Sequence, residues 1–469
     1  MSIPGLTLPG LTLSNAPPPT SAPSPTSRTH TLPPRTEYRF ESPPHSPLTI
    51  KLLSGTAELF GTELAPQVPY NFQHAKGAVY TWHGCVLEIT GAADGEYVAE
   101  ETPMGQYANL HFALEGMRNA AEMGGGIGPR VCVVGPAGSG KTSLVRILTG
   151  YAVKARRQTV VVNLDPGMGM LSVPGTLSAA TFASLVDVEE GWGSSPISGP
   201  SVVPVKMPLV YHLGSAVPEE NARLFKGLVT RLALAVTSRL DEDGDVRAGG
   251  CVVDTSGSVA SGKGGYELIQ YIVSEFSVTT LIVLGSERLY SSLKQLYPPG
   301  SPTSILKLDK SGGCVDRDES WMRAARQAQI REYFFGRGAV TLSPYTQMLD
   351  FASTSIFRVS GPATSSAFDP GASSTADDDD EYEPEVYGSA QDKITPSLAL
   401  QNSLLAVTHA DPSESADEIR MASVMGYVYV ADVDEGKKKL RVLSPVSARV
   451  PAKALLWGGF PEDVVDLVG

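Results

Sequence analysis

One stretch constrains the fold of this chain more than any other: residues 131–143 read VCVVGPAGSGKTS. Its four leading apolar residues are typical of a buried parallel strand. The next eight have the spacing G-x-x-x-x-G-K-[ST] of a phosphate-binding loop. The apolar pattern from Ser143 to Ala155 predicts the helix that this motif requires. A glycine-rich turn with a chance lysine would not have this strand and helix on its two sides, so the chain is expected to bind a nucleotide.

Each residue type in the loop has a physical role in holding phosphates. Gly135, Gly138 and Gly140 let the backbone curl, so that its N–H groups and the following helix N-terminus form an anion site. Lys141 supplies a charge for the β- and γ-phosphates, and Thr142 can place its hydroxyl on Mg²⁺.

Segments around the loop alternate between strand and helix patterns, which predicts an α/β domain whose mostly parallel sheet has helices on both faces. We place this domain at residues 128–335. Within it, residues 240–249 are expected to form a solvated acidic loop, and residues 327–335 a helix that leads out of the domain. Four strands are predicted from the runs VCVVG, TVVVNLD, GCVVDTSG and TTLIVLG.

The rest of the chain divides by composition. Residues 1–34 are rich in Pro, Ser and Thr and are expected to be a disordered tail. Short alternating runs over 35–106 predict an N-terminal β-sandwich, and 107–127 predict a connecting helix. Residues 336–469 predict a small β-rich or mixed domain, with a disordered acidic insert at 361–395. A hairpin is expected to close at residues 434–436.

The net charge of −13 argues against a protein that holds nucleic acid by bulk electrostatics, although a local basic groove stays open. The four cysteines, Cys85, Cys132, Cys251 and Cys314, are far apart and form no C-x-x-C, which indicates neither disulfides nor a zinc site. No run reaches the about 18 apolar residues of a membrane span, and the N-terminus lacks a signal-peptide pattern. We therefore expect a soluble intracellular protein.

Two carboxylates follow apolar strands and are candidates for Mg²⁺, which needs an anionic oxygen beside the phosphates. Asp254 begins DTSG, and Asp165 begins DPGMGM. Either could instead cap a helix or a turn. DTSG also resembles the D-x-x-G of GTPases, but the nearest match to their N-K-x-D is LKLD, where Leu306 replaces the asparagine, so GTP is disfavoured.

Six ordered motifs together resemble the RNA 5′-hydroxyl kinase family. Within that family they look most like the fungal-like, kinase-defective branch that serves as the ATP-binding subunit of the pre-mRNA 3′-end cleavage and polyadenylation factor, cleavage factor I. The motifs are the β-rich N-terminal domain, GPAGSGKTSLVRILTGYAV, NLDPGMGMLSVPGTLSA, CVVDTSG, KSGG followed by IREYFFG, and KKKLRVLSPV.

This resemblance implies ATP and Mg²⁺ held between the N-terminal and central domains. Glu37 and Lys76 match family positions that reach the nucleotide from the N-terminal domain. Thr142, Asp165 and Asp254 would bind Mg²⁺ directly or through water. The loop residues expected around the phosphates are Gly138, Ser139, Gly140, Lys141, Thr142 and Ser143.

Three departures from the kinase pattern fall on the side of RNA and phosphoryl transfer. Met168 stands where active relatives have glutamine, and Ser258 where they stack a tryptophan on an RNA base. In the lid after KSGG, Arg317 matches one phosphate-clamping arginine, but the second position is Met322, beside Arg323. A thioether cannot donate a hydrogen bond, and a lost base stack weakens RNA binding.

The resemblance therefore implies a kinase-inactive nuclear subunit, required for the endonucleolytic cleavage that precedes polyadenylation. ATP would act structurally, and the central domain would dock a scaffold subunit of the factor alongside other cleavage and polyadenylation subunits, with at most weak contact with RNA and none with a membrane. The alternative is an active ATP-dependent RNA 5′-hydroxyl kinase in which Lys141, Thr142, Asp165 and Arg317 are catalytic. A third hypothesis is a GTPase that acts in the assembly of a complex.

Overall fold

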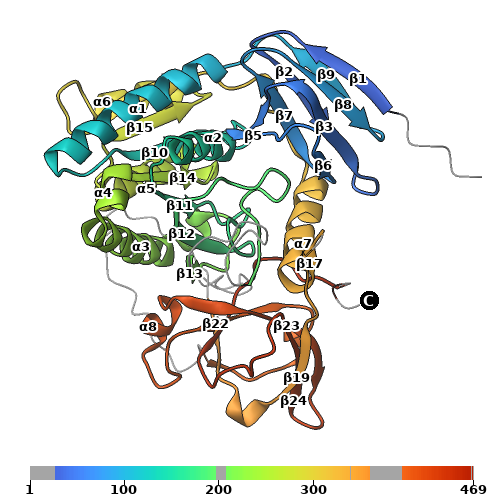
Figure 1. Cartoon of the computed structure of the whole chain (residues 1–469). Coiled ribbons are helices and arrows are strands. Elements are labelled where there is room, and N and C mark those ends of the chain that lie inside the picture. Colours follow the sequence, from blue (N-terminus) through green and yellow to red (C-terminus); the bar gives the residue numbers. More distant parts are fainter. Residues whose placement is uncertain (1–26, 197–207, 339, 360–392, 466, 468–469) are drawn as a thin grey trace, which may run out of the picture.

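The computed structural model describes residues 27–196, 208–338, 340–359, 393–465 and 467. The tail expected at 1–34 and the acidic insert expected at 361–395 thus lie largely outside the described residues. Figure 1 shows a β-sandwich (blue) beside a central α/β domain (cyan to yellow), with a β-rich C-terminal domain (orange to red) beneath. This arrangement confirms the expected fold class.

The N-terminal domain is a sandwich of two sheets with strand orders β1-β8-β3-β6 and β5-β4-β7-β2-β9. Strands β3 and β8 alternate between buried and half-buried residues over most of their length, so that one face of each packs inward. The strands are β1 (Ser27–Leu32), β2 (Thr36–Glu41), β3 (Leu48–Gly55), β4 (Glu58–Leu59), β5 (Thr62–Glu63), β6 (Pro69–Phe72), β7 (Lys76–Thr81), β8 (Cys85–Thr90) and β9 (Gly95–Ala99).

Strand β1 corrects the prediction of a disordered tail over residues 1–34. Its six residues pair antiparallel with β8, from Ser27 opposite Thr90 to Leu32 opposite Cys85. Leu32 is buried in the core of the sandwich. The proline-rich composition around this segment concealed a strand whose partner lies more than fifty residues later in the chain.

The central sheet has the strand order β13-β12-β11-β14-β10-β15-β16. The five neighbouring strands β11, β14, β10, β15 and β16 run parallel, and β12 and β13 add an antiparallel edge. The expected mostly parallel sheet is therefore confirmed. Three of its strands, β12, β13 and β16, were not predicted. The bounds are β10 (Arg130–Val134), β11 (Thr159–Leu164), β12 (Thr176–Phe182), β13 (Leu209–His212), β14 (Cys251–Thr255), β15 (Thr280–Leu284) and β16 (Ser304–Leu308).

Successive residues of β10 supply opposite faces of the sheet, as the two-residue period of a strand requires. Val131 and Val133 belong to the core under helices α1 and α2, and Cys132 and Val134 to the core under α3, α5 and α6. The helices are α1 (Met104–Gly124), α2 (Lys141–Lys154), α3 (Ala222–Glu242), α4 (Gly244–Gly249), α5 (Gly262–Glu275) and α6 (Glu287–Leu296). Short 3₁₀ turns η1 (Pro218–Asn221) and η2 (Ser258–Ala260) precede α3 and α5.

The solvated loop predicted for residues 240–249 is wrong. Helix α3 continues to Glu242, and α4 follows after a single residue, Asp243. The carboxylate of Asp243 accepts hydrogen bonds from the backbone N–H groups of Asp245 and Val246, so it is a helix N-cap. The acidic run therefore starts a helix whose Val246 is fully buried.

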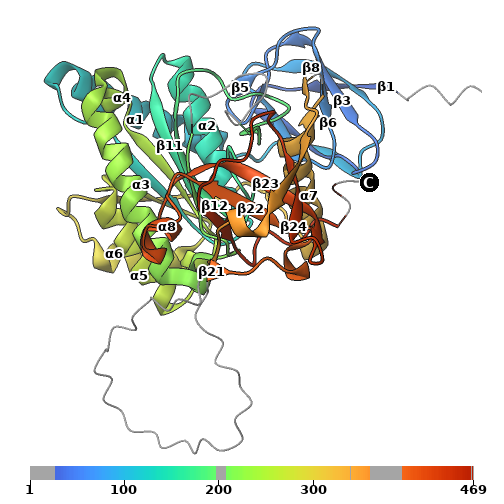
Figure 2. The same ribbon diagram turned by 90° about the horizontal axis from the view of Figure 1, so that it is seen from below.

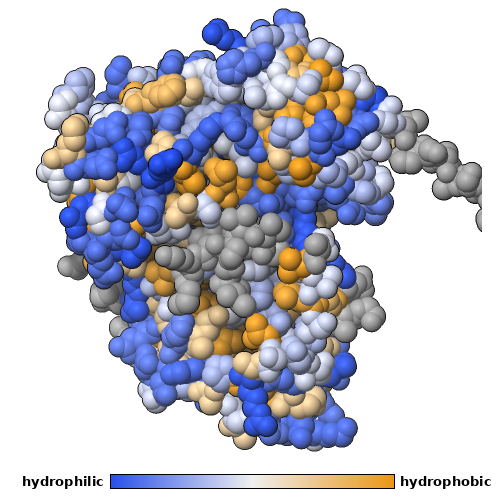
Figure 3. Space-filling model, in the orientation of Figure 1, coloured by the Kyte–Doolittle hydropathy of each residue, from blue (hydrophilic) through white to orange (hydrophobic). Residues whose placement is uncertain are grey.

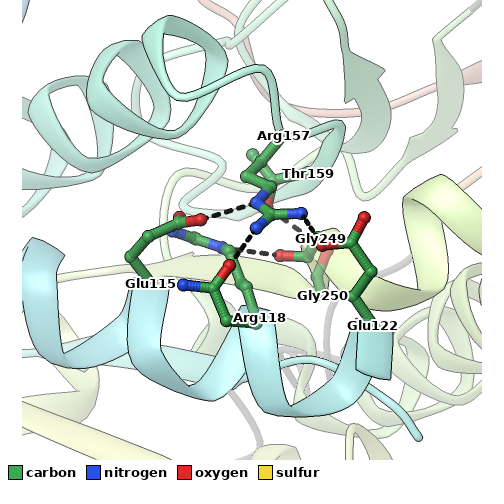
Figure 4. A network of polar contacts seen from close by, with 8 residues as sticks. Glu115, Arg118, Glu122, Arg157, Thr159, Gly249 and Gly250 are labelled. Atoms are coloured by element: carbon green, nitrogen blue, oxygen red, sulfur yellow. Dashed lines mark hydrogen bonds and ion pairs between the residues drawn. The ribbon is translucent and has the colours of Figure 1, made fainter. Parts of the chain in front are cut away.

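A polar network fastens α1 to the central domain (Figure 4). Arg118 is almost fully buried and donates from Nε to the carbonyl oxygen of Gly249 at 3.1 Å. Arg157, between α2 and β11, donates to Glu115 at 2.6 Å and to Glu122 at 2.7 Å. The helix expected only to connect two domains thus also forms part of the central domain's surface.

The C-terminal domain is built on one sheet with the strand order β19-β24-β23-β22-β25-β20-β21. Asp434 pairs with Lys439 at the end of β23 and β24, which confirms the predicted hairpin. The strands are β19 (Tyr345–Asp350), β20 (Ile356–Arg358), β21 (Lys393–Ile394), β22 (Leu404–Thr408), β23 (Val424–Asp434), β24 (Lys439–Ser444) and β25 (Leu455–Trp457). Shorter elements are β17 (Gly336–Arg337), β18 (Val340–Thr341), η3 (Phe351–Ser353), η4 (Leu398–Leu400) and α8 (Ala416–Arg420).

Strand β21 corrects the predicted end of the acidic insert, because Lys393 and Ile394 pair with β20. Helix α7 (Glu319–Phe335) begins two turns before the predicted start at residue 327. It lies between the N-terminal and C-terminal domains, as Figure 1 and Figure 2 both show. None of the helices in the described part of the chain has the length and apolar character needed to cross a membrane.

Candidate functional site

The phosphate-binding loop connects β10 to α2 at the carboxyl edge of the parallel strands. Gly138 and Gly140 adopt φ values of 66° and 89°, a left-handed conformation that favours glycine. Helix α2 has no side chain hydrogen-bonded at its N-cap and no acidic residue in its first turn. Its N-terminal N–H groups and positive dipole end therefore remain available to an anion.

Packing gives a second reason for glycine in this loop. A Cβ atom at Gly140 would lie 2.7 Å from Sγ of Cys314, and one at Gly135 would lie 2.4 Å from the carbonyl oxygen of Leu284. The segment after β16 thus rests directly on the loop. A Cβ at Gly138 would also lie 3.4 Å from Oδ1 of Asp316.

Lys141 reaches back over the loop that it follows. Its Nζ donates to the carbonyl oxygens of Gly135 at 2.9 Å and Pro136 at 3.0 Å. Burial lowers the pKa of this ammonium, although the carboxylates of Asp254 and Asp165 oppose that shift. Within the described residues, this buried cation is held by two carbonyl oxygens, which suits it to an anionic ligand.

Asp254 and Asp165 are brought together by the strand order. Strand β14 lies next to β10, and Asn163 of β11 is in register with Asp254, so Asp165 comes two residues beyond it at the same sheet edge. Thr142 Oγ1 donates to Oδ2 of Asp254 at 2.6 Å. Oδ1 of Asp254 is buried and has no hydrogen-bond partner among the described residues.

Burial raises the pKa of Asp254 to about 7 and also raises that of Asp165, and the nearby Lys141 ammonium lowers both. An unpartnered buried carboxylate oxygen beside a threonine hydroxyl is the donor set that Mg²⁺ takes next to a phosphate-binding loop. In the described part of the chain, no three His, Cys, Asp or Glu side chains gather to form a metal site. A cation here would therefore share its coordination with phosphates and water.

The loop opens into a cavity of about 1090 Å³ lined by residues of all three domains. Figure 3 shows the molecular surface in the orientation of Figure 1, with an indentation between the N-terminal and C-terminal domains. Ser139 does not line the cavity, and its buried hydroxyl has no partner among the described residues. The other residues expected at the site do line it: Glu37, Lys76, Gly138, Gly140, Lys141, Thr142, Ser143, Asp165, Asp254 and Arg317.

Glu37 and Lys76 enter the cavity from β2 and β7 of the N-terminal domain. Glu37 is almost fully buried and accepts from Arg39 Nε at 2.5 Å and from Thr102 Oγ1 at 2.9 Å. Lys76 pairs with Glu41 at 3.0 Å. Sequence reasoning missed Arg39, whose guanidinium packs against the KSGG segment, although its position two residues after Glu37 places both on one face of the strand.

Arg317 lies at the lid over the loop, and burial lowers its pKa. Its guanidinium stacks on the ring of Trp321, with 4.6 Å between Cζ and the ring centroid. On the N-terminal domain, His74 stacks on the same tryptophan at 4.7 Å between centroids, and its ring also contacts the Trp321 carbonyl oxygen at 3.2 Å. Neither Trp321 nor His74 was anticipated, because they are 247 residues apart.

All three departures from the kinase pattern line the cavity: Met168, Ser258 and Met322. Arg323, the neighbour of Met322, is exposed and is not a lining residue. The side of the cavity expected to face RNA thus presents two thioethers and one small hydroxyl.

The guanine-specific element of a GTPase receives no support. Leu306 lies on the edge strand β16 and is 41% exposed. Asp309 accepts from Gln106 Nε2 at 2.5 Å, and its carbonyl oxygen accepts from Tyr107 at 3.0 Å. None of the four residues of LKLD is among those that line the cavity.

Comparison with known proteins agrees with this geometry over the whole chain. Three family models match: the P-loop of mRNA cleavage and polyadenylation factor CLP1 over residues 135–336, the N-terminal beta-sandwich domain of polyadenylation factor over 31–121, and pre-mRNA cleavage complex II protein Clp1 over 342–462. The P-loop match implies nucleotide binding.

Curated relatives carry the same description. The mRNA cleavage and polyadenylation factor CLP1 of Phaeosphaeria nodorum is 56% identical over 99% of this chain and 100% of its own. That of Botryotinia fuckeliana is 50% identical over the full length of both chains.

Two solved structures, each 28% identical with a TM-score of 0.80, cover 93% of this chain and 99% or 98% of theirs. One is a wild-type Clp1p–Pcf11p complex, and the other describes an extended Pcf11p–Clp1p interface and ATP loss in a point mutant. The resemblance seen in the motifs is therefore confirmed, and this chain belongs to the family of the mRNA cleavage and polyadenylation factor CLP1.

Proposed function

We propose that this chain is the ATP-binding, kinase-inactive subunit of a nuclear complex that cleaves pre-mRNA before polyadenylation. Its similarity over the full length to mRNA cleavage and polyadenylation factors supports the process, and nuclear location follows from that process. The cavity over the phosphate-binding loop supports the part of the proposal that concerns ATP binding.

ATP would act by joining two domains. The cavity is lined by Glu37 and Lys76 from the N-terminal domain and by Lys141 from the central domain. A ligand that binds only the assembled arrangement stabilises it by its binding free energy. Mg²⁺, held by Thr142 and Asp254 with Asp165 close by, would neutralise charge on the β- and γ-phosphates.

One observation carries the kinase-inactive part of the proposal: Met168, Ser258 and Met322 all line the cavity. Phosphoryl transfer depends on positioning and on cationic stabilisation of the transferred group, and one clamping arginine is worth about 10³ to 10⁵ in rate. Arg317 alone matches the arginine pattern of the lid. The residues that bind ATP are thus retained, whereas the positions that phosphoryl transfer to RNA requires have lost their polar contacts.

The proposed partner is a scaffold subunit equivalent to Pcf11p, which both similar solved structures contain in complex with Clp1p. We place its docking surface on the central domain. Other subunits of the same complex would assemble through this scaffold.

A second candidate is an active RNA 5′-hydroxyl kinase. It is favoured by the retention of Asp165, which shares the cavity with Lys141, Thr142 and Arg317. In that case these four residues would be catalytic.

The test begins with identification of the nucleotide that remains bound after purification of the full-length chain. We expect stoichiometric ATP, loss of ATP in Lys141→Ala, and retention in Lys154→Ala, whose exposed ammonium pairs with Glu63 at the other end of α2. Capture of the Pcf11p-like subunit should weaken in Lys141→Ala only. Purification without nucleotide, or ADP as the sole ligand, would contradict the proposal.

A further inference from the structure

The cavity end away from the N-terminal domain is closed by a short segment that we term the strap, residues 458–462. Phe460 N donates to the carbonyl oxygen of Gly214 at 3.1 Å. A Cβ at Gly458 would lie 2.5 Å from Gly214 Cα, and one at Gly175 would lie 2.9 Å from the Phe460 carbonyl oxygen. The strap therefore packs closely on two loops of the central domain.

Arg326 of α7 binds the strap by its guanidinium. The Arg326 side chain is only 6% exposed. Its Nε donates to Oε2 of Glu462 at 3.1 Å, and Nη2 pairs with the other oxygen of the same carboxylate. Nη2 also donates to Glu319 at 2.6 Å, and the Phe460 ring lies under the guanidinium at 5.4 Å. Arg326 therefore makes a bidentate ion pair with Glu462, and the same guanidinium also binds Glu319.

The position of Arg326 connects it to the proposed acceptor side. Met322 lies one helical turn earlier on α7, and both residues line the cavity. Gln329, on the next turn, donates to the carbonyl oxygens of Gly169 at 2.6 Å and Ser172 at 2.9 Å, in the loop that follows Met168. Arg326 therefore lies on α7 between Met322, where the kinase pattern is broken, and Gln329, which holds the loop after Met168.

The charges at this end of the cavity oppose a polyanion. Arg326 contributes one positive charge, and Glu319 and Glu462 contribute two negative charges, which leaves a net charge of −1. A phosphate that approached Arg326 would have to displace a carboxylate already paired with it, and would meet the displaced charge at short range. RNA binding, in contrast, depends on cations that are free to neutralise phosphates.

We propose that Arg326 and Glu462 are specificity-determining residues that exclude RNA from the acceptor end of the ATP cavity. The inference rests on the proposed function, since it takes the phosphate-binding loop as the ATP side. This ionic barrier would act against RNA in addition to the polar contacts that are lost at Met168, Ser258 and Met322.

The test measures binding of a fluorescent 5′-hydroxyl oligoribonucleotide to the full-length, ATP-loaded chain by anisotropy. Glu462→Gln should bind RNA about tenfold more tightly than the wild type, and Glu319→Gln/Glu462→Gln more tightly again, because each change removes a negative charge beside Arg326. Asp463→Asn is the matched control, since it removes the same charge from the next residue, which is exposed. Adding Arg326→Met to the double variant should abolish the gain.

A gain no larger than that of Asp463→Asn, or a gain that survives Arg326→Met, would overturn the proposal. Glu319→Gln alone provides a second route if Glu462→Gln does not fold, because Glu319 is 80% exposed, and it should tighten RNA binding about threefold. Bound ATP is quantified in every sample. Absence of ATP from the wild type would refute the proposed function, whereas equal RNA affinities in ATP-loaded samples would refute only the barrier.

Discussion

Thr142 donates a 2.6 Å hydrogen bond to one oxygen of Asp254, and the other oxygen of that buried carboxylate has no partner among the described residues. A hydroxyl and a carboxylate held in this way at a phosphate-binding loop form half of a Mg²⁺ site, and phosphates and water would supply the rest.

The first prediction concerns removal of this metal. In the wild type, EDTA should speed the loss of bound ATP about tenfold, because the β- and γ-phosphates would then face Asp254 without a cation between them. Asp254→Asn should retain ATP about equally with and without EDTA. Nucleotide remaining after gel filtration measures both. The control is Asp241→Asn at the end of α3, which should behave as the wild type; an EDTA effect of full size in Asp254→Asn would contradict the assignment.

The second prediction concerns the curvature of the loop. Gly140→Ala should abolish ATP retention, because its φ of 89° is strained for alanine and its Cβ would meet the Cys314 sulfur at 2.7 Å. Gly116→Ala is the matched control, since a Cβ there meets no atom within 4 Å on the exposed face of α1. That change should raise the free energy of unfolding by about 0.5–1 kcal/mol and leave ATP bound. Normal ATP content in Gly140→Ala would show that the loop does not need this conformation.

The third prediction concerns the contact that closes the lid on the N-terminal domain. Trp321→Ala removes the ring stacked on both His74 and Arg317, so ATP should dissociate about tenfold faster in a chase experiment. Trp457→Ala tests specificity, because that ring also carries an arginine, Arg358, but lies on strand β25 of the C-terminal domain and not in the lid. If both variants released ATP at the wild-type rate, the stack would have no role in closure.

The fourth prediction concerns acid stability. Burial lowers the pKa of His212 to about 4, and its Nδ1 contacts the Tyr427 hydroxyl at 3.2 Å across the central and C-terminal domains. Because the unfolded state takes up this proton near pH 6.5 and the folded state does not, stability is lost as pH falls from about 6.5 to 4. The loss should reach about 2 kcal/mol at pH 5 relative to pH 7.5.

Urea unfolding at the two pH values measures this change. His212→Gln should lower the free energy of unfolding at pH 7.5. On acidification, this free energy should fall less in the variant than in the wild type, and the difference is the contribution of His212. An equal loss in the variant would mean that other residues govern the acid sensitivity.

The local motifs were predictable from sequence because each is complete within a few residues. The strand, loop and helix from Val131 to Ala155 combine an apolar run, fixed glycine spacing and an amphipathic pattern, and the structure forms all three. Asp165 and Asp254 were placed at one sheet edge because both follow parallel strands.

The unpredicted features depend on partners far away in the chain. Strand β1 exists because β8 offers it an edge, and β16 is half exposed and lacks the apolar run of a central strand. His74 and Trp321, and Arg326 and Glu462, meet across 247 and 136 residues, so no local pattern marks them.

The most direct measurement is transfer of labelled γ-phosphate from ATP to a 5′-hydroxyl RNA, with an active kinase of the same family as the positive control. We expect the wild-type chain to transfer no more than Lys141→Ala, while its bound ATP remains intact. Transfer by the wild type that Lys141→Ala and Asp165→Asn both abolish would contradict the structural role of ATP and establish the chain as an RNA kinase.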